Sequence, residues 1–302
     1  MDKIYVISEH AETYHRLLHN AALPALTVVN KPEQATIWLA DPPLAAPLLP
    51  HSDQLRWLQS TFAGVDALIN ARERHYQLTN VRGIFGALMA EYVFGYLLNE
   101  TRHITQYADQ QAQRHWQPHD YASLRGRTLA ILGSGAIGQH IATVARAFGM
   151  RVLGTNQDGR PVDGFEQTLT LTALRNQLSD VDVLVSTLPA TTETAQCLNT
   201  DFWQYAQDLF FINVGRGATV DEPALIKALD EKKTARRRTG CHAAGAITSS
   251  ASFFGRTLAF TLPHILLPSV FLSRFFDLFA DNYRRWYAGE PLFHQVDFNK
   301  GY

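Results

Sequence analysis

The chain has 302 residues, of which 46% are hydrophobic and 18% charged, with 27 Lys and Arg against 28 Asp and Glu. This globular composition is long enough for two domains and excludes a largely disordered chain. The near-neutral balance gives no electrostatic reason to expect nucleic acid or an anionic membrane as a partner, so we expect a small-molecule ligand.

Cysteine use and the N-terminus exclude further classes. Cys197 and Cys241 are the only cysteines, too few and too far apart for a zinc site or a disulfide framework, so we expect no metal. The N-terminus, MDKIYVISEH, lacks the basic start and long apolar core of a signal peptide. The apolar stretch 258–272 contains His264 and two prolines and does not fit a membrane span. We therefore expect a cytoplasmic protein.

The first ninety or so residues predict a small α/β unit. Short apolar runs alternate with helical or turn segments, and the runs predicted as strands are residues 4–7, 26–29, 37–39 and 57–60. The proline-rich residues 41–50 (DPPLAAPLLP) predict a surface loop, because proline fixes φ and removes a ladder donor. Residues 89–102 predict a long amphipathic helix that continues toward Trp116 and connects two domains.

Residues 128–138, TLAILGSGAIG, combine an apolar run with three glycines at the spacing G-x-G-x-x-G. The run 129–132 predicts a strand buried on both faces, and apolar residues at helical spacing over 139–148 predict a helix after it. The glycines therefore lie where a strand turns into a helix, which is the context that a dinucleotide-binding motif requires.

Each glycine of the motif has a physical role in such a site. Gly133 permits a tight turn, Gly135 lets the backbone approach a pyrophosphate, and Gly138 lets the helix pack closely on the strand. Free N–H groups at the helix start, which includes Ala136 and Ile137, favour an anion. The motif predicts a dinucleotide site, and an ordinary glycine-rich turn is the alternative.

The residues after the next predicted strand, 151–155, bear on the choice of dinucleotide. An acid about 20 positions beyond the glycines binds the ribose 2′-hydroxyl of NAD, whereas its absence beside an arginine favours the 2′-phosphate of NADP. Asn156 stands where the acid is expected, and Arg160 follows in the loop. The sequence favours NADP over NAD, but Asp158 would supply the acid if the strand ended later.

The rest of the second half alternates helix and strand again. Residues 171–179 predict a helix, and residues 181–187 and 209–214 predict strands. This alternation is typical of a doubly wound parallel sheet, whose ligand lies at the carboxyl ends of the strands.

Three further motifs follow predicted strands: residues 186–189 (STLP), 213–217 (NVGRG) and 262–264 (LPH). Together with the glycine motif, residues 58–69 (LQSTFAGVDALI), residues 89–98 (MAEYVFGYLL) and residues 280–292 (ADNYRRWYAGEPL) stand in matching order. On these residues the sequence resembles the D-isomer-specific 2-hydroxyacid dehydrogenases, and within them the glyoxylate/hydroxypyruvate reductases. The resemblance covers nearly the whole chain.

The resemblance implies an α/β fold in which a Rossmann domain is inserted into a split, flavodoxin-like substrate domain. We expect the substrate domain at residues 1–94 and 275–302 and the nucleotide-binding domain at residues 95–274. Relatives are dimers through the nucleotide domain, so a homodimer is expected by analogy.

The resemblance also implies the substrate site. Arg216 would hold the carboxylate of a 2-oxo acid, which suits a rigid guanidinium fork, and would polarise the adjacent carbonyl. His264 would protonate the carbonyl oxygen while hydride arrives from the nicotinamide. The backbone N–H groups of Ala63, Gly64 and Val65 would bind the substrate carboxylate, although by themselves they suggest only a turn. Further cofactor contacts are implied at Thr187, Leu188, Pro189, Val214 and Gly215.

The segment 234–262 departs from the family's pattern. The family places a glutamate in a D-V-F-x-x-E-P type segment between its arginine and its histidine, where it keeps the histidine protonated. By spacing from Arg216, Gly240 stands at the aspartate and residues 245–246 (Gly-Ala) at the Glu-Pro pair. No Asp or Glu occurs from 232 through 276, a bias that suits a segment translated in a shifted reading frame.

Two consequences follow from this departure. Arg236 to Arg238 fall where a buried parallel strand is expected, and an unpaired buried charge is unfavourable, so the strand would shift or expose them. Without its carboxylate partner, His264 would keep a pKa near the ordinary value of about 6.5 and be mostly neutral at pH 7. The alternatives are that His242 replaces the partner, or that the three arginines form a solvated basic face.

The sequence therefore predicts an enzyme that uses NADP or NAD to reduce small 2-oxo acids of the glyoxylate or hydroxypyruvate type. We expect the activity to be impaired, because losing a general acid usually costs on the order of 10² to 10⁴ in rate. The alternative is a catalytically inactive dinucleotide-binding or cofactor-sensing protein on the same fold.

Overall fold

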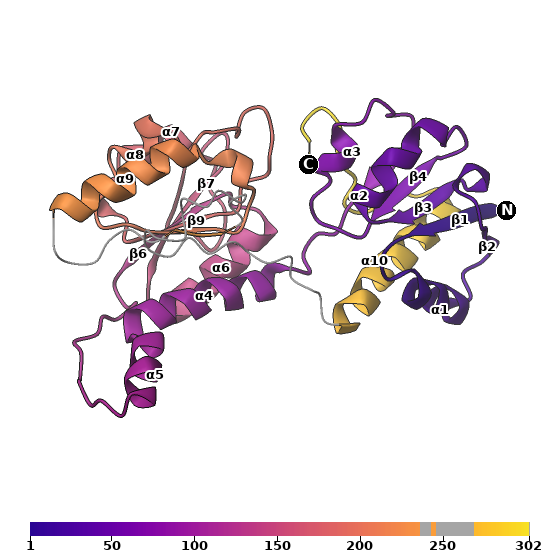
Figure 1. The fold of residues 1–302 in the computed structure, drawn as a ribbon. Coiled ribbons are helices and arrows are strands. Elements are labelled where there is room, and N and C mark those ends of the chain that lie inside the picture. The colour runs from indigo at the N-terminus through magenta and orange to yellow at the C-terminus, as the bar shows by residue number, and fades with distance from the viewer. Residues whose placement is uncertain (236–242, 246–268, 302) are drawn as a thin grey trace. The chain divides into compact units, whose positions relative to one another are not determined.

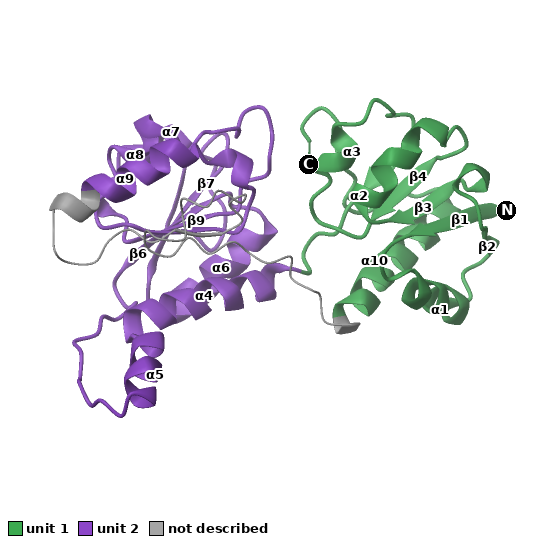
Figure 2. Cartoon of the chain, in the orientation of Figure 1, with its two compact units in different colours: residues 1–84, 265–302 green, residues 85–264 purple. Residues whose placement is uncertain are grey.

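The computed structural model describes residues 1–235, 243–245 and 269–301 (Figure 1). The chain divides into two compact units, unit 1 from residues 1–84 and 265–302 and unit 2 from residues 85–264 (Figure 2). Each unit is built on a parallel sheet with helices packed against it. The α/β class predicted from the sequence is confirmed.

Unit 1 has a five-stranded sheet in the order β2-β1-β3-β4-β5, which is the flavodoxin-like order. Its strands are β1 (Asp2–Ile7), β2 (Leu26–Val28), β3 (Ile37–Ala40), β4 (Trp57–Ser60) and β5 (Gln77–Thr79). Its helices are α1 (Ala11–Ala21), η1 (Pro32–Gln34), α2 (Pro42–Ala45), η2 (Ala46–His51), α3 (Asp66–Ile69) and α10 (Ser269–Ala288).

Helix α10 comes from the far end of the chain and completes the core of unit 1. The ring of Trp57 stacks on Phe279 and Trp286 of α10, with centroid separations of 5.4 and 5.6 Å. The buried Asn282 donates from Nδ2 to Gln59 Oε1 (3.0 Å), and its Oδ1 accepts from the N–H of Phe293 (2.7 Å). The C-terminal segment is therefore an integral part of this unit.

The prediction of a surface loop for residues 41–50 is wrong. These residues form α2 and η2, with Pro42, Ala45 and Leu49 buried against the core. Proline is tolerated at the first helical position, where its missing N–H has no intrahelical partner. Burial of the apolar side chains then favours two short helical segments over a loop.

Unit 2 has a six-stranded parallel sheet in the order β11-β10-β9-β6-β7-β8. Its strands are β6 (Thr128–Leu132), β7 (Arg151–Thr155), β8 (Gln167–Leu169), β9 (Val183–Ser186), β10 (Phe210–Asn213) and β11 (Ala243–Gly245). Its helices are α4 (Gly86–Arg102), α5 (Ile104–Ala112), α6 (Ala136–Ala147), α7 (Leu171–Arg175), η3 (Leu178–Asp180), α8 (Thr200–Trp203), η4 (Gly217–Thr219) and α9 (Glu222–Ala235).

Helices cover both faces of the sheet of unit 2 (Figure 1). Leu129 and Ile131 pack in one hydrophobic cluster with α4 and α6, whereas Ala130 and Leu132 pack in another with α7, α8 and α9. Successive side chains of a strand point to opposite faces, so β6 is buried on both sides. This is the doubly wound arrangement predicted from the sequence.

Two helices differ from their predicted bounds. The helix predicted for residues 171–179 is divided into α7 and η3. The helix predicted to continue from 102 toward Trp116 instead ends at Arg102, because His103 has a left-handed backbone with φ 55°. The side chain of Asn99 accepts from the N–H of Thr105 at 3.0 Å and so favours the start of α5.

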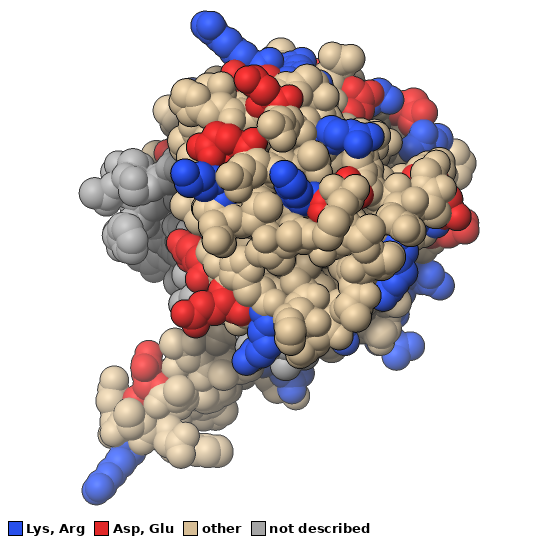
Figure 3. Space-filling model, turned by 90° about the vertical axis from the view of Figure 1, so that its right-hand side faces the viewer, with Lys and Arg blue, Asp and Glu red and all other residues tan. Residues whose placement is uncertain are grey.

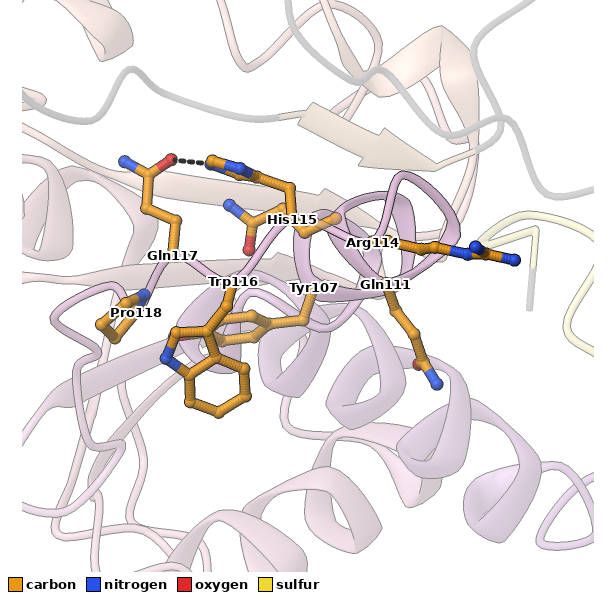
Figure 4. Close-up of a pocket in the computed structure, with 8 residues that line it drawn as sticks. Tyr107, Gln111, Arg114, His115, Trp116, Gln117 and Pro118 are labelled. Carbon is orange, nitrogen blue, oxygen red and sulfur yellow. Dashed lines mark hydrogen bonds between the residues drawn. The ribbon is translucent and has the colours of Figure 1, made fainter.

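Residues 103–123, here called the arm, extend from the end of α4 (Figure 1). The arm is folded on itself: the Tyr107 hydroxyl accepts from the N–H of His119 at 2.9 Å, and a ring nitrogen of His103 lies 3.0 Å from the carbonyl of Asp120. A cavity of about 590 Å³ opens on the arm, and Figure 4 shows its lining residues, which include Trp116 and His115.

The strand expected at Arg236 to Arg238 is not tested, because these residues lie outside the described ranges. A strand does pair in parallel with β10 further along the chain, namely β11, formed by Ala243–Gly245. On the face shown in Figure 3, acidic and basic side chains are interspersed. Among the described helices, none has the length and apolarity required to cross a membrane.

Candidate active site

Most of the sequence-predicted site residues lie in unit 2, in loops that follow four neighbouring parallel strands. These loops are residues 133–135 after β6, 156–160 after β7, 187–189 after β9 and 214–216 after β10. Strands β7 and β8 extend the sheet on one side of the β6 and β9 pair, and β10 and β11 extend it on the other. Ligands of doubly wound sheets bind at such a switch point, outside the carboxyl ends of the strands.

The first loop turns sharply at Gly133, where φ is +98°, a value that glycine adopts readily. Thr155 at the end of β7 fixes this turn, since its Oγ1 accepts from the N–H of Gly133 (3.2 Å) and its carbonyl from that of Ser134 (2.8 Å). Thr155 is a site residue for which the sequence predicted no role. Its signal would have been a hydroxyl residue at the end of the strand next to the glycine motif.

Gly138 brings the first turn of α6 against the end of β6. A Cβ atom there would lie 2.1 Å from the carbonyl oxygen of Gly133, so only glycine fits. On the other side of the turn, Thr187 Oγ1 lies 2.9 Å from the carbonyl oxygen of Leu132 and 3.1 Å from that of Gly133, within donating distance of both. The loop is therefore held between α6 and the end of β9.

This packing leaves a row of backbone donors open. The N–H groups of Gly135, Ala136, Ile137 and Gly138 donate no hydrogen bond within the described part of the chain. A Cβ at Gly135 would meet no atom within 4 Å, so the space beside the first of these residues is open. A pyrophosphate needs such donors and such space at a helix N-terminus, and this loop provides both.

The loop after β7 carries a second feature that fits a dinucleotide. Asn156 donates from Nδ2 to the carbonyl of Arg160 (2.9 Å), while its Oδ1 is buried and has no hydrogen-bond partner in the described residues. A ribose hydroxyl could donate to that oxygen. Arg160 and Asp158 are both exposed, with Nη1 and Oδ2 3.9 Å apart.

The loops after β9 and β10 meet through Gly215. A Cβ at Gly215 would lie 2.5 Å from the carbonyl oxygen of Leu188, so the two loops pack backbone to backbone. The N–H of Val214 donates to the carbonyl of Ser186 (2.9 Å), and the carbonyl of Pro189 accepts from Thr194 Oγ1 (2.6 Å). The residues at the ends of β9 and β10 are thus packed closely together and held by hydrogen bonds.

Arg216 follows directly, and its backbone is fixed on two sides. The fully buried Asn213 donates from Nδ2 to the carbonyl of Arg216 (3.1 Å), and that carbonyl also accepts from Thr219 Oγ1 (2.7 Å). The guanidinium donates from Nη1 to the carbonyl of Gly215 (3.2 Å). Asn213, which belongs to the NVGRG motif but for which the sequence predicted no role, thus anchors the arginine loop.

In unit 1, Ala63, Gly64 and Val65 lie in the loop between β4 and α3. Their backbone N–H groups donate to no acceptor within the described ranges, 1–235, 243–245 and 269–301. The carbonyl of Ala63 accepts from Asn80 Nδ2 at 2.8 Å, which fixes the orientation of the loop.

Other candidate chemistry is limited. His264 lies outside the described residues. Burial raises the pKa of the Cys197 thiol to about 11, so at neutral pH it stays protonated and is a poor nucleophile. Within the part of the chain that the structure describes, no three His, Cys, Asp or Glu residues are grouped to hold a metal ion.

Known proteins share both the sequence pattern and the fold of this chain. Residues 94–265 match the family model described as D-isomer specific 2-hydroxyacid dehydrogenase, NAD binding domain. A crystal structure of a D-isomer specific 2-hydroxyacid dehydrogenase family protein from Aeromonas salmonicida is similar at a TM-score of 0.88 and 40% identity, covering 98% of this chain and 99% of that chain.

Two further proteins are more distant. Glyoxylate/hydroxypyruvate reductase A of Serratia proteamaculans is 28% identical over 84% of each chain. The NADPH-dependent glyoxylate/hydroxypyruvate reductase of Sinorhizobium meliloti, solved with NADP and sulfate, has a TM-score of 0.83 at 22% identity and full coverage of both chains, a likeness of fold alone.

The two motif glycines are expected to fail differently on substitution. Gly138→Ala should lower the thermal midpoint, because the backbone must move away from the carbonyl of Gly133. Gly135→Ala should leave the midpoint nearly unchanged yet weaken NADPH binding by about tenfold or more, because its methyl group enters the space in front of the open N–H groups. Differential scanning fluorimetry and titration calorimetry measure the two effects. Wild-type affinity in Gly135→Ala would exclude this loop as the pyrophosphate site.

Proposed function

The chain belongs to the D-isomer-specific 2-hydroxyacid dehydrogenase family, and we propose that it reduces small 2-oxo acids of the glyoxylate or hydroxypyruvate type with NADPH. The observation that carries the proposal is the row of N–H groups at Gly135–Gly138 that have no acceptor among the described residues. They lie at the carboxyl ends of the strands, where the Arg216 loop also lies. The substrate class is that of the named Serratia relative.

Each part of the proposed site has a defined task. When bound, the nicotinamide supplies hydride to the carbonyl carbon. Arg216 binds the substrate carboxylate and polarises the adjacent carbonyl, with its backbone held in place by Asn213. The N–H groups of residues 63–65 contribute to binding a substrate carboxylate, and His264 gives a proton to the carbonyl oxygen.

The test is NADPH oxidation, followed by the loss of the absorbance of the reduced nicotinamide, with glyoxylate and with hydroxypyruvate as substrates. We expect slow, saturable turnover that Arg216→Gln abolishes, because a neutral amide cannot replace the guanidinium at the carboxylate. NADPH binding should survive that substitution. NADPH binding without turnover of either acid by the wild-type chain would instead support the inactive dinucleotide-binding protein.

The proposed impairment rests on position 245, where the chain has glycine at the expected place of the catalytic glutamate. Gly245→Glu should raise kcat by about tenfold or more, since a carboxylate there would keep His264 protonated at neutral pH. The double variant Gly245→Glu, His264→Gln should lose the gain. An unchanged rate in Gly245→Glu would show that the missing carboxylate does not limit the enzyme.

We assign the preference for NADPH to the loop after β7. Asn156 carries no charge to repel a 2′-phosphate, and Arg160 lies exposed in the same loop. Arg160→Gln should weaken NADPH binding by about tenfold and leave NADH binding unchanged, because only NADPH carries the phosphate. Asp158→Asn should strengthen NADPH binding, since it removes a competing carboxylate. Equal effects on both coenzymes in calorimetric titrations would contradict this assignment.

We further propose a homodimer formed through the arm. The arm exposes large apolar side chains, with Trp116 93%, Tyr121 62% and Ile104 54% exposed, and such clusters are typical of protein interfaces. Size-exclusion chromatography with light scattering should give twice the chain mass for the wild type. Trp116→Ser should shift the protein toward monomer, whereas Tyr205→Ser, at an exposed aromatic outside the arm, should not. A monomeric wild type would exclude the dimer.

A further inference from the structure

A buried asparagine in unit 1 links the substrate loop to a charged side chain that the proposed mechanism does not use. Asn80 follows β5 and is only 4% exposed. Its Nδ2 donates to the carbonyl of Ala63 (2.8 Å), and its backbone N–H donates to the carbonyl of His294 (3.1 Å). The loop of residues 63–65 is thereby tied to β5 and to the C-terminal segment.

The remaining oxygen of this amide orients Arg82. Arg82 donates from Nε to Asn80 Oδ1 at 3.1 Å. The Asn80 amide thus connects the guanidinium to the carbonyl of Ala63. The side chain is exposed, and no Asp or Glu of the described residues forms an ion pair with it. An arginine held through Nε presents its two terminal nitrogens as a fork that matches a carboxylate.

His294 lies beside this guanidinium. Burial, and then the positive charge of Arg82, lower the pKa of His294, so near neutral pH its ring carries no charge to compete for an anion. Its backbone is left-handed, with φ 57°, a conformation that a non-glycine residue adopts at some cost. The imidazole therefore leaves the charge of Arg82 available to an anion.

We propose that Arg82 is a specificity-determining residue that binds a second carboxylate of the substrate, so that the chain prefers 2-oxo dicarboxylates to unsubstituted 2-oxo acids. The inference rests on the proposed function, in which the first carboxylate lies on the N–H groups of residues 63–65. Asn80 separates that loop from Arg82, so a substrate with one carboxylate on the loop leaves the guanidinium for another anionic group. Glyoxylate has no such group.

The matched ligands for the test are 2-oxoglutarate and 2-oxopentanoate, which share the same carbon chain and differ in the second carboxylate. Calorimetric titration of the full chain saturated with NADP⁺ measures their binding without turnover. The wild type should bind 2-oxoglutarate about ten- to a hundredfold more tightly than 2-oxopentanoate, the range expected for a charge-assisted hydrogen-bond pair. Arg82→Gln should remove that ratio and leave 2-oxopentanoate affinity unchanged.

Two control variants separate charge from fork geometry and from long-range effects. Arg82→Lys should retain part of the preference, because it keeps the charge but not the bidentate fork. Arg16→Gln removes the same charge from an exposed position on α1 and should retain the full preference. Thermal midpoints equal to that of the wild type show that the variants are folded.

The outcomes that overturn the inference differ from those that overturn the proposed function. Equal wild-type affinities for the two ligands, or an equal loss of both in Arg82→Gln, would mean that Arg82 does not recognise a second carboxylate, while the proposed function stands. Binding of neither ligand by the wild-type chain would overturn the inference, whereas the proposed function fails only if NADPH oxidation is absent with both glyoxylate and hydroxypyruvate.

Discussion

The contact between Gly138 and the carbonyl of Gly133 is the constraint on which the nucleotide site depends. A Cβ at position 138 would lie 2.1 Å from that oxygen, so the first turn of α6 reaches the end of β6 only because the residue is glycine. Thr187 closes the same turn from the neighbouring strand. With the helix start fixed there, its first N–H groups have no acceptor among the described residues, and Gly135 adjoins open space, as anion binding requires.

In both units a side-chain amide hydrogen bond to the backbone holds the loop of the candidate substrate residues. In each, an asparagine buried at or just after the end of a parallel strand donates from Nδ2 to the carbonyl of a site residue: Asn213 to Arg216 at 3.1 Å and Asn80 to Ala63 at 2.8 Å. An amide buried in this way orients a loop without adding charge to the site. In unit 1 this amide also brings Arg82 to the substrate loop, which is the basis for the proposed selectivity.

The parts of the fold that the sequence predicted well are those that adjacent residues specify. The apolar run before Gly133 and the helical spacing after it define β6 and α6 with no information from other segments. Strands β5 and β8 were missed, because QLT and QTL carry no apolar run and become strands only by pairing with β4 and β7. The continuation of α4 was wrong because its end depends on one left-handed residue, His103.

The same distinction separates the predicted site residues from the missed ones. The glycines, Asn156 and Arg216 stand in motifs that can be read along the chain. Thr155 and Asn80 act on loops that are distant in sequence, and Asn80 follows a strand that was itself not predicted. Their roles arise from the order of the strands, which local sequence patterns do not specify.

A crystal structure of the chain grown with NADPH tests the central claim most directly. The account predicts electron density for the pyrophosphate within hydrogen-bonding distance of the backbone nitrogens of residues 135–138. An NADPH molecule bound elsewhere, or density absent from this loop in a crystal soaked to saturation, would contradict it.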